Sequence, residues 1–189
     1  HIVDGGYPLA WVGIARHDEA RSVEPVAIAG TEAMRAHVEG LRLTWAESGT
    51  GRGPTGTAIR EGLVDMAQDI RSDPRYDFWH DDSTRFGIAS SIALPLKDKQ
   101  ITFGALSIYA TETNAFDTQE IDLLKELADD LAYGIVSLRN SAMRDRFERE
   151  LEFQANFDMV TSLANRSLFL DRLDQSIIHA GHANRHVAV

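Results

Sequence analysis

Cysteine is absent from this sequence of 189 residues, and its absence excludes several kinds of chemistry. Disulfides, thiolate metal sites, cysteine nucleophiles and thioether-linked chromophores all need a sulfur that the chain lacks. No apolar run approaches the roughly 20 residues of a membrane-spanning helix, so the sequence predicts no membrane segment. Basic residues are few and scattered, with 19 Lys and Arg against 29 Asp and Glu and a net charge of -10. Such an acidic surface repels phosphate backbones, which argues against nucleic acid as a partner.

The rest of the composition is that of a folded protein. Apolar residues make up 43% and charged residues 25% of the chain, so we expect a packed core. A chain without cysteine fits a reducing compartment, and we expect it to be cytoplasmic. It begins at His1 and ends at Val189 inside an apolar run. We therefore expect a piece of a longer protein, whose other parts could carry a membrane anchor.

Alternating apolar runs predict an α+β fold around one antiparallel sheet. The predicted strands are residues 10–16, 22–29, 63–67, 88–96 and 101–110. Helical patterns lie between them, at residues 31–40, 57–60 and 76–86. The polar residues 97–100 predict a hairpin loop, and Gly104 inside the last strand indicates a bulge or a close backbone approach.

A long helix is predicted after the last strand. Asp117 opens it, and Glu120 three residues later completes a capping box. Apolar residues then recur at alternating spacings of four and three, at Leu124, Ala128, Leu131, Ile135, Leu138 and Ala142. The pattern then shifts by one position, to Met143, Phe147 and Leu151. A seam of this kind with a stutter is typical of a coiled coil, so we expect a parallel homodimer through residues 117–155.

Residues 158–173 read D-M-V-T-S-L-A-N-R-S-L-F-L-D-R-L. This segment resembles the opening of GGDEF domains, which are diguanylate cyclases, written D-x-L-T-G-L-x-N-R-x-x-F-x-x-R-L. Val160 is a conservative departure, and Ser162 replaces the usual Gly. The resemblance implies that Asn165 and Asp174 contact the guanine of GTP, with Mg, in the full-length parent protein. The alternative is that Asn165 and Arg166 only cap and brace the start of a helix.

The rest of that resemblance concerns catalysis. In the GGDEF family, the metal-binding acidic residues and the GGDEF loop follow further along the chain. Phosphoryl transfer depends on those metal ions and positioned charges. We therefore expect this fragment to have no catalytic residues, and its parent to be a diguanylate cyclase.

Five blocks of sequence resemble GAF domains in their order and spacing: residues 10–13, 51–60, 69–75, 90–96 and 103–106, followed by a closing helix at residues 117–135. The resemblance implies an antiparallel sheet with helices on one face and a ligand cavity on the other. It also implies small-molecule sensing. We expect three parts: a GAF domain at residues 1–140, a coiled-coil signalling helix at 141–156, and the truncated start of a GGDEF domain at 157–189.

Small-molecule sites are concave and mostly apolar, with a few placed polar groups. The aromatic residues between 76 and 86 could form such a wall, although aromatic clusters more often belong to a core. Our candidate pocket residues are Thr57, Asp69, Arg75, Phe78, Trp79, Ser90, Ser91 and Tyr109. The glycine-rich residues 47–56 are interpreted as a turn or as an anion cradle at a helix start. The ligand itself is left unidentified.

Other ligand classes have weaker signals. Some GAF domains bind haem through a histidine, but a lone histidine beside two aspartates, such as His80, is more simply a surface residue. His179, His182 and His186 are interpreted as solvated, so no metal site is predicted. The signature of cyclic-nucleotide-binding GAF domains is not evident, and a GAF reductase that works through cysteines is excluded by composition.

Together these patterns predict a sensory input module of a bacterial cyclic di-GMP signalling protein. A small ligand in the GAF cavity would control a C-terminal diguanylate cyclase through the dimeric helix. Two alternatives remain: a ligand-free structural dimerisation domain, or an input domain for a degenerate GGDEF or phosphodiesterase protein.

Overall fold

The computed structural model describes residues 6–47, 49–158 and 160–183. The chain divides into two units, His1–Val136 and Ser137–Val189. Expectations about the chain ends, Ser48, Met159 and His186 lie outside the described residues.

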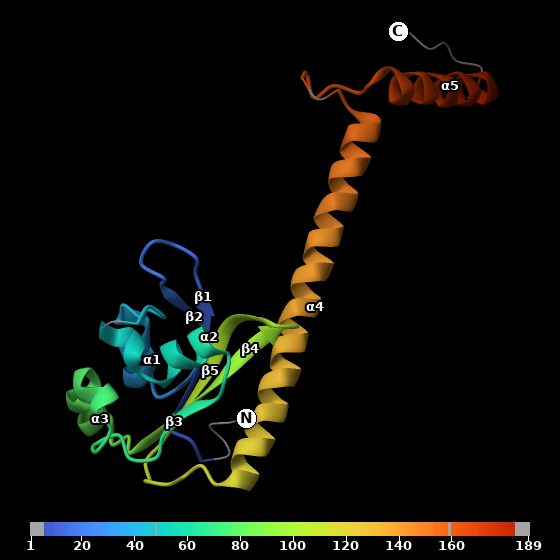
Figure 1. Cartoon of the computed structure of the whole chain (residues 1–189). Helices are drawn as coiled ribbons and strands as arrows, with labels where there is room; N and C mark the ends of the chain where they lie inside the picture. The colour runs from blue at the N-terminus through green and yellow to red at the C-terminus, as the bar shows by residue number, and fades with distance from the viewer. Residues whose placement is uncertain (1–5, 48, 159, 184–189) are drawn as a thin grey trace. The chain divides into compact units, whose positions relative to one another are not determined.

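A five-stranded antiparallel sheet forms the centre of the first unit (Figure 1). Its order is β2-β1-β5-β4-β3. The strands are β1 (Leu9–Ala15), β2 (Val23–Gly30), β3 (Asp65–Ala67), β4 (Ser90–Asp98) and β5 (Ile101–Ala110). The α+β fold class predicted from the sequence is confirmed. The short β3 and the Pro-containing β2 form the two edges, where a missing ladder donor costs least.

Two hairpins build most of this sheet. β1 pairs with β2 from Leu9 opposite Gly30 onward, and Asp18 holds the turn by accepting the amide of Ser22 at 2.8 Å. β4 and β5 pair over their whole length, as the polar loop predicted. Gly104 marks a close approach, because a Cβ there would lie 2.3 Å from the carbonyl oxygen of Gly13 on β1.

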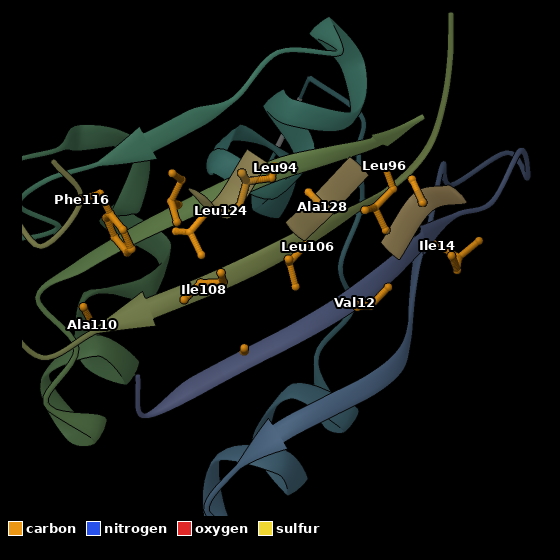
Figure 2. Close-up of a cluster of buried hydrophobic side chains, with 13 residues drawn as sticks. Val12, Ile14, Leu94, Leu96, Leu106, Ile108, Ala110, Phe116, Leu124 and Ala128 are labelled. Atoms are coloured by element: carbon orange, nitrogen blue, oxygen red, sulfur yellow. The ribbon is translucent and has the colours of Figure 1, made fainter. Parts of the chain in front are cut away.

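The two faces of the sheet carry different partners, because side chains alternate along each strand. One face packs against the first part of the long helix α4 (Thr118–Asn156). Figure 2 shows this face, with Val12, Leu94, Leu106 and Ile108 beside Leu124 and Ala128 of the helix. The other face is covered by α1 (Glu32–Gly40) and α2 (Pro54–Glu61), and farther along by the 3-10 segment η3 (Pro74–Trp79) and α3 (His80–Phe86).

Helix α4 begins where the sequence indicates. The Asp117 carboxylate accepts the Glu120 amide at 2.8 Å, as an N-cap should. The reciprocal half of the predicted capping box is wrong, because the Glu120 carboxylate instead accepts the hydroxyl of Tyr7. The Tyr7 ring stacks on Phe116, with centroids 5.9 Å apart. The chain before β1 is thereby joined to the first turn of α4.

The predicted coiled-coil seam splits in two. Leu124 and Ala128 are 3% and 2% exposed because they pack on the chain's own sheet. Assigning them to a seam between protomers was therefore wrong. A helix lying on a sheet needs the same spacing of three and four as a coiled coil, so the pattern alone does not separate the two. The later positions differ: Leu138 and Phe147 are 73% and 59% exposed.

The second unit contains the rest of α4, a turn, and α5 (Arg166–Ala183). Phe153 and Phe157 stack near the end of α4, with ring centroids 4.9 Å apart. An isolated bridge joins Phe157 to Ala164 and closes the turn. No helix within the described residues is long and apolar enough to cross a bilayer.

Candidate functional site

A cavity of about 80 Å³ lies on the sheet face that carries the short helices. One water-sized group needs roughly 10–15 Å³ by this measure, so the space holds about six or seven. Strands β1 and β5 supply its floor, and α1, the start of α2, η3 and α3 supply its walls. The family resemblance placed the cavity on the sheet face away from the helices. The structure corrects this, because α4 fills that other face and the cavity lies beneath the short helices.

Trp11 and Tyr109 form the polar part of the floor. The Trp11 indole Nε1 donates to the Tyr109 hydroxyl at 3.3 Å. Burial raises the pKa of Tyr109, although its hydrogen bonds with Trp11 and Thr55 act in the opposite direction. Thr55, in the first turn of α2, also shares a hydrogen bond with Ser107 of β5 at 2.8 Å. The start of α2 is thus fixed to the sheet beside the cavity.

Tyr76 of η3 adds a second buried phenol to the lining. Its hydroxyl pairs with the Ser91 hydroxyl of β4, and burial raises its pKa well above the usual range. Both phenols therefore stay neutral at physiological pH, and their hydroxyls act as hydrogen-bonding groups.

A contact between a histidine and an aspartate joins two of the covering helices. The His37 Nε2 of α1 lies 3.3 Å from an Asp82 carboxylate oxygen of α3. Their side chains keep 22% and 32% of their surface exposed, so the pair lies between the cavity and solvent. The His37 ring also packs against Phe86, with centroids 5.1 Å apart. Sequence reasoning missed both members, because nothing in the sequence pairs a residue of α1 with one of α3.

The structure brings only part of the predicted pocket together. Trp79 and Tyr109 line the cavity, as do Tyr76 and Phe86 of the proposed aromatic wall. The other predicted pocket residues lie outside the lining: Thr57, Asp69, Arg75, Phe78, Ser90 and Ser91. Each of these has a structural reason.

Ser90 and Ser91 are neighbours on β4, so they point to opposite faces of the sheet. The Ser90 hydroxyl donates to the Glu112 carbonyl at 2.7 Å. Ser91 is on the same side of the sheet as the cavity, but its hydroxyl pairs with that of Tyr76, and it is Tyr76 that lines the cavity.

Arg75 and Asp69 hold local structure. The Arg75 guanidinium bonds Asp65 at 2.6 Å, Asp73 at 2.7 Å and the Met66 carbonyl at 2.9 Å, and so fastens η3 to β3. Hydrogen bonds from Arg75 lower the pKa of Asp73. The Asp69 carboxylate accepts the amide of Arg71 at 3.0 Å, which is a turn contact. Phe78 is 65% exposed.

The glycine-rich loop is a close-packed turn whose end borders the cavity. A Cβ on Gly51 would lie 2.0 Å from the Ala46 carbonyl oxygen, so only glycine fits there. The Arg60 guanidinium donates to the Gly51 carbonyl at 2.8 Å and to Thr57 at 3.1 Å, which explains the position of Thr57. Gly53, Pro54 and Thr55 line the cavity, and no side chain caps α2.

Of the histidines singled out in the sequence, those that the structure describes do not line the cavity, and His80 is half-buried. His80 Nε2 lies 3.2 Å from the Ile70 carbonyl oxygen, and His80 does not line the cavity. His179 is exposed, and its ring Nδ1 lies 3.0 Å from the Gln175 carbonyl oxygen of the same helix. The side chain of His182 and all of His186 lie outside the description. Within the described residues, no group of His, Asp and Glu could hold a metal ion.

Asn165 and Asp174, the two guanine contacts implied by the GGDEF resemblance, lie in the second unit. The Asn165 side chain accepts the Leu168 amide at 2.9 Å and donates to the Ala155 carbonyl at 2.7 Å. It therefore caps α5 and ties it to the end of α4. Asp174 is exposed on α5.

Solved structures share this fold at low sequence identity. The GAF domain region of a putative membrane protein from Geobacter sulfurreducens PCA aligns with a TM-score of 0.58 and 20% identity, over 71% of this chain and 84% of that one. A domain of a putative two-component sensor histidine kinase from Sinorhizobium meliloti 1021 gives 0.57 and 18%, over 76% and 90%. Free methionine-R-sulfoxide reductase from Neisseria meningitidis, in complex with its substrate, gives 0.57 and 19%, over 72% and 71%. No curated protein matches this chain.

The decisive match is to a family. A family model described as GAF domain covers residues 1–136. That range includes the whole sheet, the cavity and the part of α4 that packs on the sheet. The chain belongs to the GAF domain family of sensory domains.

Proposed function

We propose that this domain senses a small molecule in the cavity and passes its occupancy through α4 to an output domain that follows. The observation that carries the proposal is the cavity itself, with a mostly apolar lining and the His37–Asp82 contact at its edge. Ligand sites have this character. That a domain of a putative sensor histidine kinase shares the fold is consistent with such a role.

Two hydrogen bonds between Gln68 and the backbone of Phe116 support transmission of a structural change from the cavity to α4. The Gln68 side chain donates to the Phe116 carbonyl at 2.6 Å and accepts its amide at 3.4 Å. Two residues later, Ile70 lines the cavity. One short segment thus borders the cavity and also holds Phe116, which lies two residues before the start of α4. A ligand that displaces this segment would shift the start of α4, which is the differential contact that coupling needs.

The output is proposed to be a diguanylate cyclase, which makes the parent a bacterial cyclic di-GMP signalling protein. Asn165 and Asp174 would contact GTP there, with Mg supplied downstream. One backbone angle supports the resemblance: Ser162, at the position where the GGDEF pattern has Gly, has a φ of 56°. That left-handed region is the one that glycine favours.

The exposed part of α4 supports homodimerisation. Leu138, Met143, Phe147 and Leu151 are each more than half exposed. An apolar stripe on a single helix is stabilised by burial against a partner, and a second copy of the chain provides one. Dimerisation of α4 would carry the shift at its start to paired output domains.

The sensory role is tested by ligand screening on the full chain. We expect at least one class of small metabolite to raise the unfolding temperature and to bind by titration calorimetry. Val38→Phe, which adds volume to a buried wall residue of the cavity, should abolish that binding, whereas Leu63→Phe at an exposed site should not. Circular dichroism checks that both variants fold. If no class of compound binds, the cavity is structural and the sensory proposal fails.

A further inference from the structure

The cavity's charges indicate the class of its ligand. Among the described residues that line it, Asp82 is the only carboxylate and His37 the only base, and there is no Lys or Arg. The two phenols of the lining are held neutral by burial. An anionic ligand would therefore find no Lys or Arg side chain in the lining, and it would face the Asp82 carboxylate. The site favours a neutral or positively charged molecule.

The aromatic lining separates these two possibilities. Five side chains of the cavity are aromatic: Trp11, Tyr76, Trp79, Phe86 and Tyr109. The face of an aromatic ring attracts a cation, most strongly for Trp, and the attraction grows when water is excluded. The Arg85 guanidinium already lies over Phe86, 5.2 Å from the ring centroid. Trp11, Trp79 and the two tyrosines are the remaining aromatic side chains of the lining.

The size of the cavity limits the cation. Its volume of about 80 Å³ suits roughly six or seven water-sized groups. Choline, with about seven non-hydrogen atoms, and the smaller tetramethylammonium ion fall in this range. A nucleotide or a haem does not.

We propose that the cavity binds a small alkylammonium cation, held by the aromatic faces of Trp11 and Trp79 and neutralised by the Asp82 carboxylate. This inference rests on the proposed sensory function and names the ligand class of the same site. Binding would draw Asp82 toward the ligand and away from His37, which loosens the contact between α3 and α1. The ligand would thereby act on the same helices that cover the cavity.

Choline and its neutral carbon analogue, 3,3-dimethylbutan-1-ol, test the proposal on the full chain by titration calorimetry. The two molecules have the same shape and differ only in charge. We expect choline to bind about tenfold more tightly or better. Asp82→Asn should weaken choline binding about tenfold, and Trp79→Leu by a similar factor. Asp81→Asn removes the same charge from an exposed neighbour and should leave binding unchanged.

Four other outcomes would overturn the proposal, and each would point to a different explanation. Equal binding of choline and the neutral alcohol would show that the cavity selects shape and not charge. Choline binding that Asp81→Asn and Asp82→Asn weaken equally would show general attraction to an acidic protein. Binding of only neutral or anionic metabolites, lost in Val38→Phe, would refute the cation but keep the sensory role. Failure of every class of compound would end both proposals.

Discussion

The two units of this chain treat their apolar side chains in opposite ways. In the first, the sheet is covered on both faces, and residues such as Ile92 and Ile108 are fully buried. In the second, Leu138 and Leu151 are 73% and 63% exposed. Helix α4 (Thr118–Asn156) contributes residues to both units. The same helical pattern thus stabilises a fold in one unit and presents a surface in the other.

The largest expected effect comes from truncating one leucine in each unit. Leu124→Ala should lower the free energy of unfolding by about 2–5 kcal/mol, because it leaves a cavity between α4 and the sheet. Leu138→Ala should change it by less than about 0.5 kcal/mol when the protein is dilute enough to be monomeric. Urea denaturation measures both values. Equal losses would mean that Leu138 is also buried within its own chain.

The second test concerns association. Phe147→Glu should raise the dissociation constant of the homodimer about tenfold or more, because a carboxylate would be desolvated in an apolar contact. Ser141→Glu adds the same charge at an exposed polar position and should act less. Analytical ultracentrifugation gives both constants. A wild-type chain that stays monomeric at every concentration would contradict the dimer proposal.

The third test measures how the stability of the first unit depends on pH through Asp73. The pKa of Asp73 is lowered in the folded state by hydrogen bonds from Arg75. Its stabilising effect is therefore present above the unfolded carboxyl pKa of about 3.9 and is lost as pH falls through the lowered folded value. Asp73→Asn should cost about 1 kcal/mol at neutral pH. The difference from wild type should shrink below about pH 4.

The control for this titration is Asp77→Asn, which removes the same charge from an exposed position of the same segment. Urea denaturation at several pH values measures all three proteins. A deficit for Asp73→Asn that persists unchanged in acid would show that the carboxylate charge is not what stabilises η3.

The smallest effect concerns the turn between α4 and α5. Ser162→Gly should stabilise this turn by about 0.5 kcal/mol, since glycine adopts a positive φ without strain. Hydrogen exchange of the Asp158 and Ser162 amides, which bond across the turn, should slow about twofold. Ser167→Gly, inside the first turn of α5, should have the opposite sign. Faster exchange in Ser162→Gly would show that the serine side chain matters more than the backbone angle.

The sequence predicted the first unit well wherever the information was local. The alternating runs placed all five strands, and Asp117 placed the start of α4. The candidate site was harder, because it depends on which face of a strand a residue occupies. Ser90 and Ser91 were both proposed, although neighbours on a strand cannot share a face.

Residues distant in the sequence were harder still. Trp79 and Tyr109 could be proposed from residue type alone, but the His37–Asp82 pair arises only when α1 and α3 meet over the sheet. The seam of α4 was misassigned for a related reason. The spacing of Leu124 and Ala128 indicates that one face of the helix is buried, but it does not indicate which surface covers that face.

The three tryptophans make the first unit a natural optical reporter. Trp11 and Trp79 border the cavity, whereas Trp45 lies outside its lining, between Arg21 and His17. The second unit has no tryptophan at all. Intrinsic fluorescence therefore reads the GAF domain without any label and is blind to the unfolding of α5. A Trp45→Phe variant would leave emission only from the two indoles beside the cavity, so that occupancy could be followed in real time.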